Sequence, residues 1–149
     1  MSPTDLEALK LLPPFSDIDL TRDASLLEKI QSKVVPAGEF IFREGEAGDQ
    51  LFVIKSGEVE IVRIEDEMSE EIAFLQPGDV FGELGVLGQK TRNASARAFS
   101  DSEILIINRE TTAQLAKKLP SFDMLVGKRF LERSKASEEI EYQKPATNG

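Results

Sequence analysis

Residues 81–95 read Phe-Gly-Glu-Leu-Gly-Val-Leu-Gly-Gln-Lys-Thr-Arg-Asn-Ala-Ser, and this stretch carries the strongest signal in the chain. A strand is expected to end at Phe81, and Gly82 allows the backbone to approach a ligand closely. A helical turn that starts near Glu83 leaves unpaired N–H groups, which favour an anion. Arg92 can contact the same anion with two parallel hydrogen bonds. Because Glu83 can accept a hydrogen bond from a hydroxyl, the combination indicates a sugar-phosphate site.

A purely structural interpretation of the same residues is the alternative. In it, the glycines at positions 82, 85 and 88 only shape turns, and Arg92 pairs with Glu83 or with an exposed acid. Residue types alone leave both interpretations open. In either case nothing in the stretch activates a nucleophile, so a site here is expected to bind its ligand without transforming it.

Runs of β-branched and aromatic residues precede this stretch. They cover residues 40–42, 51–54 and 59–62. Turn residues separate them at intervals of 12, 9 and 12 positions, at Gly45, Gly57, Asp66 and Gly78. Such spacing is typical of a small antiparallel sandwich or barrel. With a last strand pair around 94–99 and 103–107, residues 34–108 are predicted to form a mainly β barrel.

Residues 1–33 are predicted to form a short helical element before the barrel. Ser2-Pro3-Thr4-Asp5 has the pattern of a helix start, and Pro13-Pro14 ends that helix. Leu26, Leu27 and Ile30 follow at helical spacing and predict a second short helix.

Two helices are predicted after the barrel, within residues 109–142. Asn108 is a candidate cap for the first helix, and Pro120 separates it from the second. Residues 143–149 are expected to be a disordered tail. All these parts together are predicted to form one domain.

The composition excludes several classes of function. The chain has 149 residues, no Cys and no His, so it offers no thiolate nucleophile and lacks the commonest general base and metal ligand. An enzyme and a metal site are therefore not expected. With a net charge of −9, nucleic-acid binding is disfavoured. No membrane span or export signal is visible, so a cytoplasmic protein is expected.

The charge is concentrated in the middle of the chain. Net charge is −2 over residues 1–38, −10 over 39–83 and +3 over 84–149. Two interpretations of the acidic middle are open, namely solvated strand faces or a docking surface for a basic partner.

The stretch at 81–95 closely resembles the phosphate-binding cassette of the cyclic nucleotide-binding domain family, which occurs in regulatory subunits of cAMP-dependent protein kinase and in catabolite activator protein. Residues 37–59 and 77–83 resemble two further motifs of that family in the same order. The resemblance covers about residues 12–133. It implies an eight-stranded antiparallel jelly-roll β-barrel with short N-terminal helices and two C-terminal helices.

The resemblance also implies a site. By position, Glu83 is expected to bind the ribose 2′-hydroxyl and Arg92 the cyclic phosphate of the ligand. Backbone amides around Gly85 and Asn93 are expected to bind phosphate oxygens, with Gly82 giving access to the sugar. Leu84 completes the ligand-binding residues. The ligand would be cAMP or cGMP, and no catalytic cofactor is implied.

Three positions depart from the family pattern. Thr91 replaces a proline, Gly85 replaces an alanine, and Asn93 stands where the family carries Ala in cAMP-selective sites and Thr or Ser in cGMP-selective ones. Because Asn can donate and accept hydrogen bonds, it can either reach a guanine amino group or cap the turn. We expect cAMP to be favoured over cGMP.

The family usually closes a C-terminal helix over the base, and the candidate lid residues are Phe130 and Tyr142. Phe130 also fits the apolar stripe of its helix, so a core position is the competing interpretation. The expected function is a regulatory module without an output domain, which signals occupancy through its C-terminal helices to a protein effector or in a homodimer. The alternative is a degenerate fold that serves as a protein–protein interaction module without nucleotide.

Overall fold

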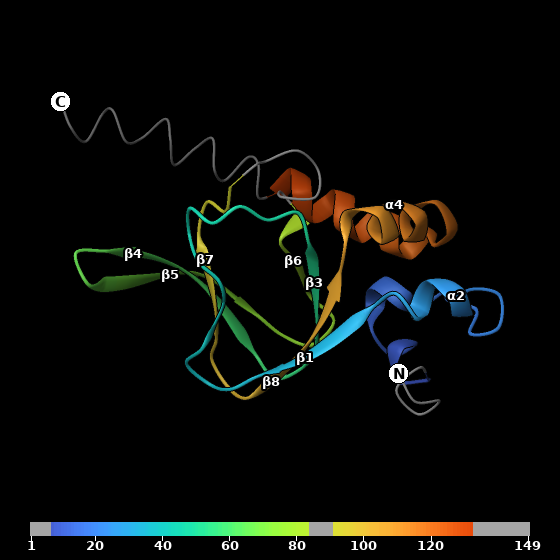
Figure 1. The fold of residues 1–149 in the computed structure, drawn as a ribbon, viewed down its shortest axis with the longest axis horizontal. Helices are drawn as coiled ribbons and strands as arrows, with labels where there is room; N and C mark the ends of the chain where they lie inside the picture. The colour runs from blue at the N-terminus through green and yellow to red at the C-terminus, as the bar shows by residue number, and fades with distance from the viewer. Residues whose placement is uncertain (1–6, 84–90, 133–149) are drawn as a thin grey trace.

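The computed structural model describes residues 7–83 and 91–132 (Figure 1). Over these residues the chain forms eight strands in two four-stranded sheets, and every strand pairing is antiparallel. The first sheet has the order β1 (Gln31–Val35), β8 (Ser102–Ile107), β3 (Leu51–Ser56), β6 (Val80–Phe81). The second has the order β2 (Phe40–Phe42), β7 (Ser95–Ala98), β4 (Val59–Glu65), β5 (Met68–Leu75). The predicted eight-stranded jelly roll is confirmed.

Apolar side chains from both sheets meet in the barrel interior. This cluster includes Phe52 and Ile104 from the first sheet and Val59 and Ala96 from the second. Alternation along β4 explains the arrangement, because Val59 is buried while its neighbour Glu60 pairs with Arg97 on the other face at 2.7 Å.

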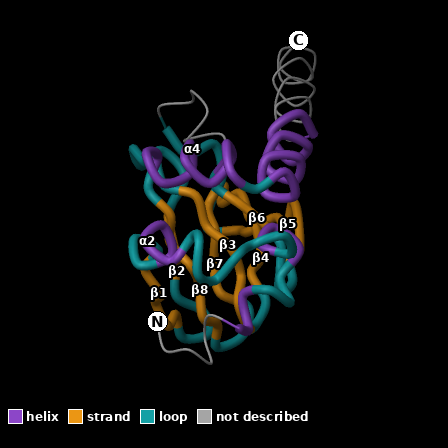
Figure 2. The backbone as a smooth tube through the Cα atoms, turned by 90° about the vertical axis from the view of Figure 1, so that its right-hand side faces the viewer, coloured by secondary structure: helices purple, strands orange, loops and turns teal. Residues whose placement is uncertain are grey.

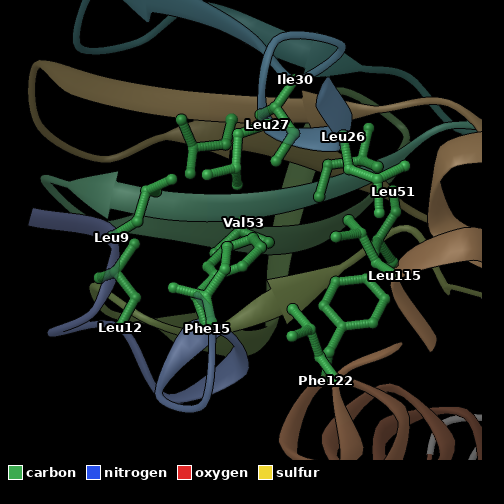
Figure 3. Close-up of a cluster of buried hydrophobic side chains, with 14 of the residues drawn as sticks. Leu9, Leu12, Phe15, Leu26, Leu27, Ile30, Leu51, Val53, Leu115 and Phe122 are labelled. Atoms are coloured by element: carbon green, nitrogen blue, oxygen red, sulfur yellow. The ribbon is translucent and has the colours of Figure 1, made fainter. Parts of the chain in front are cut away.

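A second apolar cluster lies on the opposite face of the first sheet, where the helices cover it (Figure 3). In β3 the four residues from Leu51 to Ile54 are all buried, since both faces of this strand are covered. Phe15 and Phe122 join the N- and C-terminal helical segments with ring centroids 5.9 Å apart.

The helical segments are short before the barrel and longer after it. They comprise residues 7–9, the 3₁₀ turn Pro13–Phe15, α2 (Ala24–Leu27), α4 (Arg109–Lys118) and a helix over residues 120–132. In Figure 2, α4 and helix 120–132 lie across the upper end of the strands, and α2 lies lower, at their left side. Asn108 is confirmed as the cap of α4, because its side chain accepts a hydrogen bond from the N–H of Thr111 at 2.7 Å.

Three features differ from the expectations or lie beyond them. β1 begins at Gln31, so the first strand starts before the predicted boundary at Val34. β5 was not predicted, because its residues are mostly polar and exposed and show no alternation of buried and exposed positions. The predicted helix start at Ser2 and the tail at 143–149 lie outside the described residues.

Candidate functional site

The backbone of Arg92 is held by the loop that follows β2. Its N–H donates to the carbonyl oxygen of Glu46 at 2.8 Å, and its own carbonyl oxygen accepts from the N–H of Gly45 at 2.8 Å. Ala47 and Thr91 form an isolated antiparallel bridge next to these bonds. Two segments that are distant in sequence therefore fix where the Arg92 side chain begins.

The guanidinium of Arg92 is buried, and the residue is only 7% exposed. Its Nη1 donates to the carbonyl oxygen of Gly82 and its Nη2 to that of Gln50, each at 3.1 Å. The guanidinium carbon lies 4.4 Å from the ring centroid of Phe42 and 5.5 Å from that of Phe52. Two hydrogen bonds and two aromatic faces hold this cation in one orientation.

Glycines make room for the guanidinium on two sides. Gly82 has a φ of +80°, and a Cβ built there would lie 2.8 Å from the Phe52 ring and 3.1 Å from Nη1 of Arg92. A Cβ on Gly48 would lie 2.7 Å from Nη2 of the same arginine. A larger residue at either position would clash with these neighbouring atoms unless they moved. Sequence reasoning selected Gly82 but missed Gly48.

Three phenylalanines form the apolar wall beside this cation. The rings of Phe52 and Phe81 stack with centroids 5.1 Å apart, and Phe42 lies 5.6 Å and 6.1 Å from them. Because Phe81 directly precedes Gly82, the stacked pair fixes the turn in which the Gly82 carbonyl faces Arg92. The sequence signal for this wall was the aromatic content of the strands, which by itself indicates only a core.

The charges of three carboxylates act on the Arg92 guanidinium. Burial lowers the pKa of Arg92, and the negative charges of Asp49, Glu83 and Glu46 oppose that change. Arginine remains protonated in proteins, so the site holds a buried positive charge. Glu83, which follows Gly82, is fully buried. The arrangement can bind an anion at Arg92 and a hydroxyl donor at Glu83.

The described residues include four of the six predicted ligand-binding residues. Gly82, Glu83 and Arg92 lie together, and Asn93 follows Arg92 as a half-buried residue. Leu84 and Gly85 lie outside the described residues. Of the two candidate lid residues, Phe130 is half-buried on helix 120–132, and Tyr142 lies outside the described residues.

Metal binding and membrane insertion concern two further features of the described residues. Over residues 7–83 and 91–132, no group of three or more His, Cys, Asp or Glu side chains is arranged to hold a metal ion. The described helices are too short or too polar to cross a membrane.

Comparisons with known proteins identify relatives. A family model described as "Cyclic nucleotide-binding domain" matches residues 32–118. The chain is 37% identical over 95 residues to the cyclic AMP receptor protein of Thermus thermophilus, covering 63% of this chain and 44% of that protein. It is 34% identical over 110 residues to a cGMP-dependent protein kinase of Caenorhabditis elegans, covering 72% of this chain and 14% of the kinase.

A solved structure agrees with these relatives. The catabolite activator protein of Thermus thermophilus superposes with a TM-score of 0.69 at 29% sequence identity, covering 89% of this chain and 63% of that one. The chain spans less than half the length of the two curated relatives named above.

Proposed function

Because the chain belongs to the cyclic nucleotide-binding domain family, we propose that it binds a cyclic nucleotide, with cAMP favoured over cGMP, and signals occupancy to a partner protein. Arg92 contacts the cyclic phosphate and Glu83 the ribose 2′-hydroxyl. The domain acts by binding and performs no chemistry on the ligand. The observation that carries this proposal is the buried, pre-oriented guanidinium of Arg92 beside the fully buried Glu83.

The orientation of Arg92 supports binding of a monoanion. Its two hydrogen bonds to Gly82 and Gln50 have neutral carbonyl oxygens as acceptors. In hydrogen bonds to phosphate oxygens both the donor and the acceptor are charged, whereas in the bonds to these carbonyl oxygens only the donor is, so the phosphate bonds are the stronger ones. A guanidinium has five N–H donors, more than two carbonyls require. Phosphate binding therefore gains the stronger bonds without first ordering the side chain.

Glu83 supports recognition of the ribose. An ionised carboxylate only accepts hydrogen bonds, so its natural partner in a nucleotide is a sugar hydroxyl. Gly82, which precedes Glu83, lets the backbone pass close to Phe52 and Arg92, because a Cβ there would meet both side chains, and we expect the glycine to give the sugar access to Glu83. A ligand without the 2′-hydroxyl would leave the buried carboxylate without that donor, which weakens binding.

The choice between the two nucleotides depends on Asn93 in this proposal. The named relatives include both a cyclic AMP receptor and a cGMP-dependent kinase. Asn93 lies next to Arg92 and is half-buried. We favour cAMP, and we expect an Asn93 amide that contacts a guanine amino group instead of capping the turn to narrow that preference without reversing it.

We expect ligand binding at the site to change the positions of the helical segments. The turn at 77–79 leads through β6 to Gly82, and it contacts both helical segments. A Cβ on Gly78 would lie 2.6 Å from Pro13, and Arg129 of helix 120–132 lies 3.6 Å from Asp79. A ligand that binds better to one arrangement of this turn shifts the helix population toward the matching arrangement.

A thermal-shift panel tests the proposed function. The panel contains cAMP, cGMP, 2′-deoxy-cAMP and adenosine, and the last is the control without phosphate. At about 100 times its dissociation constant, a ligand stabilises by about 2.7 kcal/mol, or roughly 5–10 °C for a domain of this size. We expect the largest shift with cAMP, a smaller one with 2′-deoxy-cAMP and none with adenosine. If none of the cyclic nucleotides raises Tm, the nucleotide-free interaction module is the better account.

A further inference from the structure

The β4–β5 hairpin extends from the barrel on the side away from the helices (Figure 1). β5 lies at the end of the second sheet, where β4 is its one neighbour among the described strands. Seven of its eight residues are exposed or half-buried. The turn at its tip places Asp66 at φ 52° and Glu67 at φ 67°, as a two-residue turn between antiparallel strands requires.

Large apolar side chains are exposed on this hairpin. The exposed fractions are 41% for Ile64, 76% for Met68, 43% for Ile72 and 42% for Phe74. Phe99, which follows β7, is 59% exposed and meets Phe74 edge to face with ring centroids 5.2 Å apart. We call residues 59–75 together with Phe99 the hairpin surface. Solvation of a strand face explains exposed polar residues, but it does not explain five large apolar side chains that are exposed on one hairpin and next to it.

The same hairpin is strongly acidic. Residues 59–75 contain six acidic side chains and one basic one, Arg63, which gives a net charge of −5. Glu60 is paired with Arg97 in the neighbouring strand. The other five are exposed, and they are Glu65, Asp66, Glu67, Glu70 and Glu71. Exposed apolar groups therefore lie within a negative field.

We propose that the hairpin surface docks a basic amphipathic segment of a partner protein, with apolar side chains on Phe74, Phe99 and Met68 and cationic groups on the surrounding carboxylates. Charge decides between the candidate occupants. A second copy of this chain is repelled overall by its net charge of −9, which outweighs the +3 of its residues 84–149, and nucleic acids and anionic lipid surfaces are also negative. A cationic protein segment complements both the charge and the apolar surface.

This surface is separate from the cyclic nucleotide site. The Arg92 guanidinium contacts Gly82, Gln50, Phe42 and Phe52, none of which belongs to the hairpin surface, and the proposal does not depend on the identity of the nucleotide. The two proposals can therefore fail independently.

The probe is a fluorescently labelled, helical peptide of leucine and lysine with one apolar and one cationic face. A peptide with glutamate in place of lysine is its control. We expect fluorescence anisotropy to show binding of the lysine peptide only, and we expect its affinity to fall as salt is raised. Equal binding of both peptides, or binding of neither, would overturn the proposal.

Two variants of the chain locate the binding surface. The double change Phe74→Ser and Phe99→Ser removes the aromatic pair, and its control is Leu11→Ser, an apolar residue that is 84% exposed elsewhere. The quadruple change Glu65→Gln, Glu67→Gln, Glu70→Gln and Glu71→Gln removes charge from the hairpin. Its control removes four exposed charges outside the hairpin, by Glu7→Gln, Glu28→Gln, Glu110→Gln and Asp123→Asn.

Each hairpin variant is expected to weaken peptide binding at least tenfold, and each control less than twofold. Because the substituted side chains are exposed, thermal unfolding should show all variants folded. Equal losses in the variants and their controls would mean that attraction is unspecific and would overturn the proposal. Sedimentation of the unliganded chain is the second test. A dimer that the Phe74→Ser and Phe99→Ser variant abolishes would assign the surface to a second copy instead.

Discussion

Arg129 and Asp79 form an ion pair, with Nη2 of Arg129 3.6 Å from Oδ1 of Asp79. The pair connects helix 120–132 to the turn from which β6 leads into Gly82. The same Asp79 accepts a hydrogen bond from the N–H of Gln76 through its other oxygen at 2.8 Å. The position of the helix and the shape of the turn before the site are therefore physically linked.

Removing this pair should change nucleotide affinity modestly. Both side chains are about 30% exposed, and a pair of this kind contributes about 0.5–1 kcal/mol, or roughly two- to fivefold in affinity. A double-mutant cycle of Arg129→Gln and Asp79→Asn with calorimetric titration measures the coupling. Glu132→Gln is the control, because it removes the other partner of Arg129 within the helix. Additive effects of the two changes would show that the pair does not couple helix and site.

Substitutions at Gly82 and Gly38 distinguish the stability cost of backbone strain from the cost of steric crowding. Both glycines have positive φ, +80° and +88°, but a Cβ on Gly82 meets Phe52 whereas one on Gly38 has no atom within 4 Å. Gly38→Ala should therefore lower stability by about 1 kcal/mol, and Gly82→Ala by about 2–4 kcal/mol because crowding adds to strain. Denaturant unfolding measures both. Equal losses would contradict the tight packing of Gly82.

Asn93 should decide nucleotide preference. We expect Asn93→Ala to raise the ratio of cAMP to cGMP affinity and Asn93→Thr to lower it. One hydrogen bond contributes about 1 kcal/mol, so each shift should be about fivefold. Competition titrations with both nucleotides provide the measurement. An unchanged ratio in both variants would show that Asn93 does not discriminate.

Asp23 should make stability sensitive to acid. Its carboxylate is buried and accepts hydrogen bonds from the Arg22 side chain at 3.0 and 2.9 Å, which lower the pKa of Asp23, helped by the backbone N–H of Asp19. A carboxyl group whose folded pKa is lowered stabilises the fold above its unfolded pKa and loses that contribution as pH falls through the folded value.

Asp23→Asn should therefore destabilise the protein at neutral pH and remove part of its loss of stability in acid. Thermal unfolding from about pH 7 to about pH 2 measures this dependence, across the unfolded pKa of about 4. Glu28→Gln, an exposed residue at the end of α2, is the control and should follow the wild-type profile. An Asp23→Asn profile parallel to wild type at every pH would contradict the assigned role.

The architecture could be predicted wherever local chemistry determines it. Asn108 caps its helix through its own side chain, and Gly57 and Gly78 occupy positive-φ turns between strands. β5 could not be predicted, because as an edge strand it buries only Leu75 and so shows no alternating pattern. Its structure depends on pairing with β4, which is a tertiary interaction.

The site could be predicted only in part for a related reason. Gly82, Glu83 and Arg92 belong to one sequence motif, so its resemblance to a known family predicts that they form one site. The contacts of Arg92 with Gln50 and Phe42, and the space left by Gly48, join segments far apart in sequence. Such contacts depend on how the two sheets pack against each other, and no local sequence pattern predicts them.

Calorimetric titration of cAMP into wild type, Arg92→Ala and Arg97→Ala tests whether Arg92 binds the cyclic phosphate. Arg97 is the matched control, because it pairs with Glu60 on the outer sheet face. Two charge-assisted hydrogen bonds at about 1.5 kcal/mol each predict a loss of at least about a hundredfold for Arg92→Ala, with Arg97→Ala close to wild type. Thermal unfolding confirms that each variant is folded. Equal cAMP affinity in the wild type and a folded Arg92→Ala variant would contradict the assignment of Arg92 as the phosphate-binding residue.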